Sequence, residues 1–359
     1  MSYLKYLEMK KFYQFTTFYL IIFCVCYFIY VFPFEILNEF LFNEKINRSS
    51  SLYYTILVSV LVIFYFRTYN TFKPLRIFVY EGMGVGFISF WIINIALLIN
   101  YIFIINTFYL GIISLFFITI LSITAFLLAT LIKTKTIQIF TDKINKNYSF
   151  IFLSDVHLGS NNSNHLRKII NKIDMIDFDF LLIGGDLIDS SSFSLQELKI
   201  FDKIKKPIIF TTGNHEYYIK NSKEKLNELK KYNINHLSNN NSIFQDINFI
   251  GIDDNVKKDE QISLVRNKYI VDKFNIILVH KSLIWDQIYS TCDLMLSGHT
   301  HNGQIFPFNL LVRIRFKYKY GFFKKDKSNL YVTSGAGCWG PKMRLGTFNE
   351  IIIINLMSN

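Results

Sequence analysis

The residues best suited to chemistry are acidic, amide and imidazole side chains that directly follow short apolar runs in the second half of this 359-residue chain. Five segments carry them: Asp155-Val156-His157, Gly184-Gly185-Asp186, Gly213-Asn214-His215-Glu216, His280, and Gly298-His299-Thr300-His301. Five of the seven histidines in the chain belong to this set. Carboxylate, amide and imidazole donors without thiolate favour a divalent transition metal. The sequence therefore predicts a metal centre.

This donor mixture suits a centre with two ions. Two metals roughly 3.5–4 Å apart can share one bridging carboxylate and activate a water between them. Such a pair delivers hydroxide at neutral pH and neutralises charge on phosphoryl oxygens, so it favours in-line displacement at phosphorus. Glycines before Asp186, Asn214 and His299 allow the backbone to turn sharply where each apolar run ends.

The elements that must position these residues alternate between strands and helices. Short continuous apolar runs are typical of strands buried on both faces. We expect strands at 150–153, 180–183, 208–210, 248–252, 276–279, 294–296, 331–333 and 351–354. Helical spacing predicts helices over 166–173, 195–204 and 222–232. In such α/β folds, ligands bind at the carboxyl ends of the strands, where the motif residues stand.

The ordered set DxH, GD, GNHE, H and GHTH resembles that of the calcineurin-like metallophosphoesterases over residues 149–356. Residues 298–305 and the glycine-rich segment 334–344 are similar to the bacterial membrane-anchored subgroup, which carries N-terminal spans. The resemblance implies an α/β domain of two packed β-sheets flanked by helices, joined to an α-helical transmembrane anchor. It implies a metal-dependent phosphoesterase, a hydrolase acting on ester bonds.

The resemblance also implies roles for individual residues. One divalent ion would be held by Asp155, His157, Asp186 and His301. The other would be held by Asp186, Asn214, His280 and His299, with Asp186 bridging. His215 would be catalytic rather than a ligand, stabilising the transition state or protonating the leaving oxygen. Glu216 would orient its loop. Manganese, iron, zinc, cobalt or nickel all fit oxygen and imidazole ligation.

The first part of the chain is predicted to be a membrane anchor. The chain has a net charge of +12, yet residues 1–132 hold only 13 of its 66 charged residues. Apolar stretches near 12–33, 49–66, 80–100 and 108–131 are long enough to span a bilayer, with a turn at Asn106-Thr107. We expect a four-helix transmembrane anchor at 1–132, a linker and first strand at 133–148, and the metallophosphoesterase domain at 149–359.

Loop charges predict the orientation of this anchor. Eight lysines and arginines fall in the N-terminal segment, the second loop and the segment after the last span, against two in the other loops. The side with more positive charge is the cytoplasmic one. The sequence therefore predicts a multi-pass protein of the inner, cytoplasmic membrane, with the catalytic domain facing the cytoplasm.

A basic, aromatic segment at 304–330 bears on the substrate. Arg313, Arg315, Lys317 and Lys319 alternate with apolar residues, and a period of two predicts that they share one face of a strand or hairpin. This face is either a solvated surface or a contact with anionic headgroups or substrate. Arg344 is either a phosphate contact or a structural surface arginine. The predicted membrane anchor and the modest net charge of the metallophosphoesterase domain argue against nucleic acid as a partner.

We therefore expect a membrane-tethered phosphohydrolase with two metals, a phosphodiesterase, acting on a phosphoester that is lipid- or nucleotide-linked. One alternative is cleavage of a UDP-linked acyl-sugar pyrophosphate in lipid synthesis. Another is a non-enzymatic membrane sensor that uses a relic phosphoesterase domain. The complete set of ligand types argues against the relic. The sequence fixes neither the physiological substrate nor the oligomeric state.

Overall fold

The computed structural model describes residues 3–68 and 72–359, and the side chains of residues 3–12 and 14 are not described. The chain divides into two compact units, Met1–Ala125 and Phe126–Asn359. Because their relative placement is not determined, each is described by itself.

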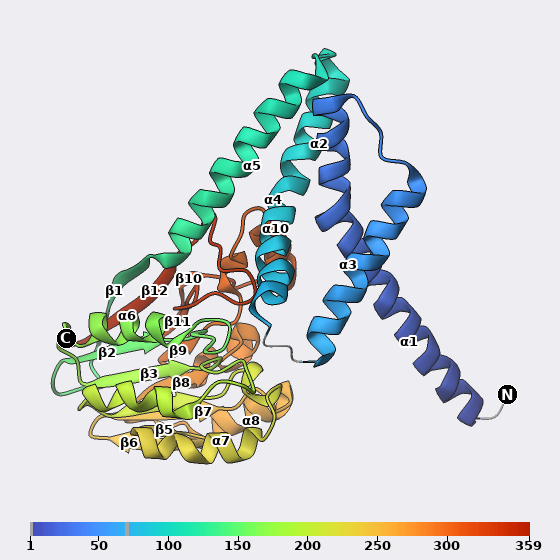
Figure 1. The fold of residues 1–359 in the computed structure, drawn as a ribbon. Helices are drawn as coiled ribbons and strands as arrows, with labels where there is room; N and C mark the ends of the chain where they lie inside the picture. Colours follow the sequence, from blue (N-terminus) through green and yellow to red (C-terminus); the bar gives the residue numbers. More distant parts are fainter. Residues whose placement is uncertain (1–2, 69–71) are drawn as a thin grey trace. The chain divides into compact units, whose positions relative to one another are not determined.

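The first unit consists of long apolar helices (Figure 1). They are α1 (Tyr3–Cys26), a π-helical turn (Tyr27–Val31), α2 (Phe32–Phe42), α3 (Arg48–Thr68), α4 (Lys73–Phe103) and α5 (Thr107–Thr130), whose last turn belongs to the second unit. Four segments are long and apolar enough to cross a membrane: Phe15–Phe42, Arg48–Thr68, Lys73–Phe103 and Thr107–Thr130. The first extends further than the predicted 12–33, because the helix continues through the π-helical turn and α2.

The helices of this unit approach closely at one glycine. A Cβ added to Gly86 of α4 would lie 2.1 Å from the backbone oxygen of Ile29 in the π-helical turn. Only glycine allows the two backbones to meet at this distance. The turn between α4 and α5 lies where Asn106-Thr107 predicted it, since Asn106 Oδ1 accepts a hydrogen bond from the amide of Phe108 at 2.9 Å.

The second unit is built on two mixed six-stranded sheets (Figure 1). The first sheet has the strand order β1-β12-β2-β3-β4-β5, and the second has the order β10-β11-β9-β8-β7-β6. The strands of the first are β1 (Ile132–Thr141), β12 (Asn349–Ser358), β2 (Tyr148–Leu153), β3 (Phe180–Gly184), β4 (Ile208–Thr211) and β5 (Ile234–His236). Those of the second are β10 (Gly321–Lys325), β11 (Ser328–Val332), β9 (Leu294–Ser297), β8 (Phe274–Val279), β7 (Ile247–Ile252) and β6 (Asn240–Phe244).

Alternation along β2 explains why its apolar run is continuous. Phe150 and Phe152 point into the core between the sheets, where Phe150 meets Phe249 of β7 edge to face at 6.0 Å. Ile151 and Leu153 point to the other face, which α6 (Ser163–Ile173) covers. The outer face of the second sheet is covered by α8 (Lys258–Lys268) and α9 (Trp285–Ile288). The predicted two-sheet architecture is confirmed.

Two predicted helices and one predicted strand differ from the structure. Residues 195–203 form a 3-10 helix, and the segment predicted as a helix over 222–232 is α7 (Ser222–Glu228) followed by a 3-10 turn. Arg313 and Arg315, for which we predicted a strand or hairpin shared with Lys317 and Lys319, lie in the helix α10 (Phe308–Arg315). That prediction was wrong, and its consequence is developed below.

Candidate metal centre

The sheets bring the predicted site residues to one edge. Strands β2, β3 and β4 run parallel within the first sheet, as do β8 and β9 within the second. Their carboxyl ends therefore lie side by side. Asp155 and His157 follow β2, Asp186 follows β3, and Asn214 follows β4. From the second sheet, His280 follows β8, while His299 and His301 follow β9.

Five of these residues hold a left-handed backbone conformation. The φ angles of Asp155, His157, Asp186, His299 and His301 are 56°, 52°, 52°, 73° and 48°. Non-glycine residues rarely adopt this region, and such strain clusters at functional sites. Neighbouring strand ends hold it in place, because the amide of Asp155 donates to the Gly185 oxygen and that of His157 to the Asp186 oxygen, both at 3.0 Å.

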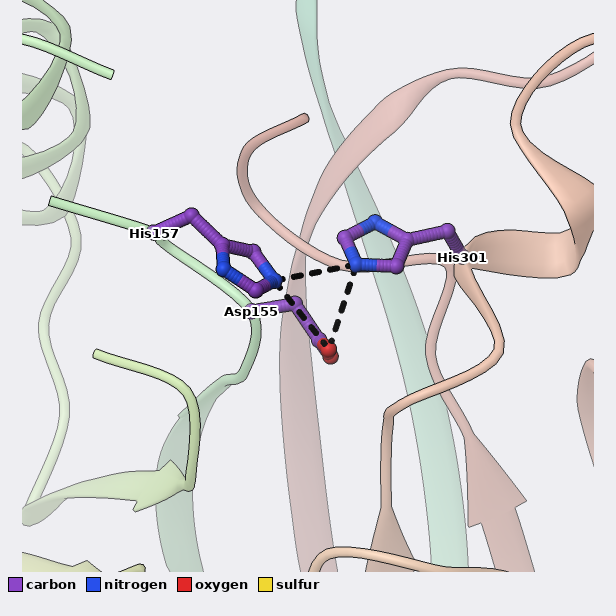
Figure 2. Close-up of side chains that lie close together, drawn as sticks. All are labelled: Asp155, His157 and His301. Atoms are coloured by element: carbon purple, nitrogen blue, oxygen red, sulfur yellow. Dashed lines mark hydrogen bonds and ion pairs between the residues drawn. The ribbon is translucent and has the colours of Figure 1, made fainter. Parts of the chain in front are cut away.

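The first cluster of converging side chains contains Asp155, His157 and His301 (Figure 2). The Nε2 atoms of the two imidazoles lie 3.1 Å apart. Asp155 Oδ1 lies 3.4 Å from Nε2 of His301 and 3.9 Å from Nε2 of His157. All three residues are buried. Three donor atoms aimed at one small space are an arrangement that could hold a metal ion.

Asp186 links this cluster to two others. It groups with His157 and His215, and it groups again with His280 and His299. Its Oδ2 lies 3.0 Å from Nε2 of His280, 3.8 Å from that of His157 and 4.0 Å from that of His215. A single carboxylate therefore reaches donors on both sides of the site.

The buried polar atoms of the site fit metal ions. Asn214 Oδ1 is buried and forms no hydrogen bond, and the buried Nε2 of His280 meets the Asp186 carboxylate at 3.0 Å. Buried polar atoms are rarely left without partners. The second ring nitrogen of His280, Nδ1, lies 2.9 Å from the Gly184 oxygen, and such a bond directs Nε2 into the cluster as the ligand atom. The donor set is oxygen and imidazole nitrogen without thiolate.

The histidines of the cluster differ in pKa because their surroundings differ. Burial lowers the pKa of His215 to about 4 and that of His299 to about 2, so both rings are neutral at pH 7. Burial and the neighbouring His157 and Arg344 hold the pKa of His301 well below its usual range. Burial acts in the same direction on His280, but the adjacent Asp186 carboxylate outweighs it and raises the pKa to about 10.

Sequence reasoning missed one residue that supports the cluster. Asp189 Oδ2 lies 3.2 Å from Nδ1 of His157, on the side of the ring opposite the cluster. The amide of Ser160 donates to Asp189 Oδ1 at 2.9 Å. Carboxylates in this position fix the orientation of a metal-binding histidine. The only sign of this supporting role in the sequence is the position of Asp189, three residues after Asp186.

Glu216 takes the orienting position that the resemblance implied. Its Oε2 accepts hydrogen bonds from the amides of Asp186 and Gly213, at 3.0 and 2.8 Å, and its Oε1 accepts one from Ile188 at 2.9 Å. Burial and the Asp186 charge raise the pKa of Glu216 to about 7. The side chain ties the turn after β3 to the turn after β4.

Arg344 is not on the surface, so that alternative was wrong. Its side chain is fully buried, and it donates to the backbone oxygens of His301, Ser334 and Gly337 at 3.0, 2.8 and 2.6 Å. Its Nε donates to Asn349 Oδ1 at 3.0 Å. Among the described residues it forms no ion pair with a carboxylate. The guanidinium is committed to holding the His301 loop rather than open to a phosphate.

The cations of the basic segment do not share one strand face. Arg313 and Arg315 lie on α10, whereas Lys317 pairs with Asp286 at 2.9 Å and Lys319 donates to the Asn309 oxygen at 3.1 Å. The apolar residues at 310, 311 and 314 have helical spacing, and this pattern prevails over the alternation of charges.

The two remaining histidines lie outside the three clusters. His165 Nε2 is 2.7 Å from the Ala336 oxygen, and His236 Nε2 is 2.8 Å from Asp253 Oδ1.

Comparison with known proteins identifies a family match within the second unit and several relatives of the chain. Residues 148–303 match the family model for calcineurin-like phosphoesterases. An uncharacterized metallophosphoesterase of Campylobacter jejuni is 36% identical over 239 residues, which are 62% of this chain and 63% of that protein. One of Helicobacter pylori strain 26695 is 34% identical over 243 residues, 63% of this chain and 64% of that protein.

A third relative carries a membrane term in its name. The Danio rerio protein called transmembrane protein with metallophosphoesterase domain is 28% identical over 228 residues, 57% of this chain and 52% of that protein. The chain thus spans less than two thirds of the length of each of these three relatives.

Proposed function

We propose that this chain, which belongs to the calcineurin-like phosphoesterase family through residues 148–303, is a membrane-tethered phosphodiesterase that uses two divalent metal ions. The observation that carries the proposal is the position of Asp186, which belongs to two of the three side-chain groups able to hold an ion. A carboxylate shared in this way is what a two-metal centre requires.

The proposed ligand sets are those that the family resemblance implies, and the three groups of converging side chains support them. Asp155, His157, Asp186 and His301 would hold one ion, and Asp186, Asn214, His280 and His299 would hold the other. When bound, the ions supply Lewis-acid charge for the phosphoryl oxygens and lower the pKa of the attacking water. The unpartnered Asn214 Oδ1 supports the second set, as does the 3.0 Å approach of His280 Nε2 to Asp186 Oδ2.

The chain's own residues supply orientation and a hydrogen-bond donor. His215 is placed at the open side of the cluster, with a side chain that is 15% exposed and a ring 5.6 Å from that of Trp339. Its amide donates to Asp186 Oδ1 at 2.9 Å, which fixes the backbone next to the shared carboxylate. Since burial lowers its pKa to about 4, the neutral ring would act at pH 7 by donating an N–H hydrogen bond to the phosphoryl or leaving oxygen.

A direct test uses the full chain in detergent with Mn²⁺ and an aryl phosphodiester. Asp186→Ala should lower kcat by at least about a hundredfold, because it removes the shared ligand. Asp177→Ala is the matched control, since the Asp177 carboxylate is fully exposed. Chelation should abolish turnover, and added Mn²⁺ should restore it. Turnover that survives Asp186→Ala would overturn the two-metal assignment.

We further propose that manganese is the working ion and that the substrate is lipid- or nucleotide-linked. Metal analysis of the purified chain tests the first point. Comparing phosphoester profiles of a deletion strain with those of a His215→Ala strain tests the second. Accumulation of the same phosphoester in both is expected, and accumulation in neither would remove the support for this substrate class.

The proposed location is the inner membrane, with four spans and the second unit in the cytoplasm. The four candidate spans and the distribution of lysine and arginine support it. A topology reporter fused after Asn359 should give a cytoplasmic signal. A periplasmic signal would contradict the charge argument.

A further inference from the structure

The helix α10 presents an apolar face to solvent. Leu310, Leu311 and Ile314 are 56%, 52% and 83% exposed, and no residue of the helix is buried. At about 100° per residue, these three side chains cover an arc of about 100° on one side of the helix. A contiguous exposed apolar surface marks a place of interaction.

Two arginines flank this apolar face. At the same angular spacing, Arg313 lies on one side of it, next to Leu310, and Arg315 lies on the other, next to Leu311. Both are exposed, and neither forms an ion pair within the described part of the chain. An apolar stripe bordered by free cations is the pattern of a helix that lies in a membrane interface, with cations at the level of anionic headgroups.

Both ends of α10 are fixed to the segment that carries two proposed metal ligands. A Cβ added to Gly303, two residues after His301, would lie 2.3 Å from Cα of Asn309 in the first turn of α10. At the other end, the ring of Phe316 packs edge-on at 5.3 Å from the ring of His299. The helix is therefore a rigid neighbour of the metal centre.

The chain also keeps this unit near a bilayer. Only Leu131 separates the last candidate span, α5, from the first strand, β1. If α5 spans a membrane, the sheet that carries the site starts within one residue of its surface. A lipid surface is thus within reach of the unit, and no partner protein needs to be invoked.

We propose that α10 is an interfacial helix that inserts Leu310, Leu311 and Ile314 into an anionic bilayer, with Arg313 and Arg315 at the headgroups. Resting on the proposed function, this would place the metal centre at headgroup level and select phosphoesters of membrane amphiphiles over soluble ones.

The test measures the insertion of α10 into lipid and does not depend on hydrolysis of a substrate. The full chain is reconstituted in nanodiscs of phosphatidylcholine, with or without phosphatidylglycerol, and an environment-sensitive dye is attached at Ile314→Cys. Cys24→Ser serves as the background, because the other three native cysteines are buried. Met175→Cys is the control position, since Met175 is 87% exposed and lies outside α10. Brominated acyl chains then report contact with lipid.

We expect quenching at position 314 that is stronger with phosphatidylglycerol, and none at position 175. Arg313→Glu with Arg315→Glu should lower the inserted-to-free ratio by at least about fivefold, whereas the charge-matched control pair Lys223→Glu with Lys230→Glu should not. Absence of quenching at 314 in both lipids would overturn the proposal. A dye shielded from water but not quenched would also overturn it, by showing that a protein covers the face.

The two proposals fail separately. A chain that hydrolyses nothing but shows lipid quenching at position 314 leaves the membrane contact standing and removes the enzyme assignment. A chain that hydrolyses phosphodiesters without quenching at 314 removes only the interfacial helix.

Discussion

Arg344→Met should destabilise the second unit by about 3 kcal/mol. The substitution removes hydrogen bonds to the oxygens of His301, Ser334 and Gly337 and to Asn349 Oδ1. The His301 oxygen keeps a second donor, the amide of Gln304, so two carbonyls lose their donor outright. Each buried acceptor left without a donor lowers the stability by about 1–3 kcal/mol. Removing a buried charge that lacks a carboxylate partner is itself stabilising and offsets part of this loss.

Hydrogen exchange of the slowest amides in β2 measures this effect, because these amides exchange only through global opening of the unit. A loss of about 3 kcal/mol corresponds to exchange that is roughly 150 times faster. Arg167→Met is the matched control, since Arg167 is exposed on α6, and it should change exchange rates little. Arg344→Lys should accelerate exchange by a factor between those of Arg344→Met and Arg167→Met, because one ammonium cannot reach all four acceptors. A change below tenfold for Arg344→Met, or an equal change for the control, would refute the reasoning.

Three further outcomes follow from the side chains around the site. Asp189→Asn should weaken metal affinity by about 10- to 100-fold in calorimetric titration, because it removes the carboxylate behind His157; unchanged affinity would contradict this. Burial would raise the pKa of Asp253, but hydrogen bonds from His236 and two hydroxyls hold it below its usual value. Its stabilising contribution is therefore full above about pH 4 and lost as the pH falls further, so Asp253→Asn should flatten the acid limb of a stability-against-pH curve. Metal-free His280, with a pKa of about 10, is protonated on both ring nitrogens at pH 7. Metal binding should therefore release about one proton, seen as a binding heat that varies with the buffer.

The strand ends could be predicted from the sequence because two independent signals coincide there. Continuous apolar runs mark the buried strands, and five of the eight predicted strands are followed by residues that can bind a metal. The structure brings the predicted residues together, since parallel strands place their carboxyl ends at one edge. Local pattern and topology determine this part of the site jointly.

Other features depended on the tertiary structure. The left-handed backbones of Asp155 and His157 leave no mark in the sequence, because neighbouring loops impose them through hydrogen bonds. The burial of Arg344 was equally hidden, since an arginine in a loop is usually exposed. The segment around 313–319 was misread because charges of period two and apolar residues of helical spacing overlap in it, and the apolar pattern prevails for residues 308–315.

Arg344 also belongs to a series of hydrogen bonds that connects the last turn of α5 to the loop that carries His301. The Nδ2 of Asn349, the first residue of β12, donates to the oxygen of Ala129 in the last turn of α5 at 2.7 Å. The Oδ1 of the same amide accepts from Arg344, which donates in turn to the backbone oxygen of His301. Asn349 and Arg344 are both fully buried, so water cannot substitute for either of them. Because every donor in this series has one defined acceptor in a close-packed interior, a displacement of the last turn of α5 would have to break a buried hydrogen bond or move the loop that carries His301.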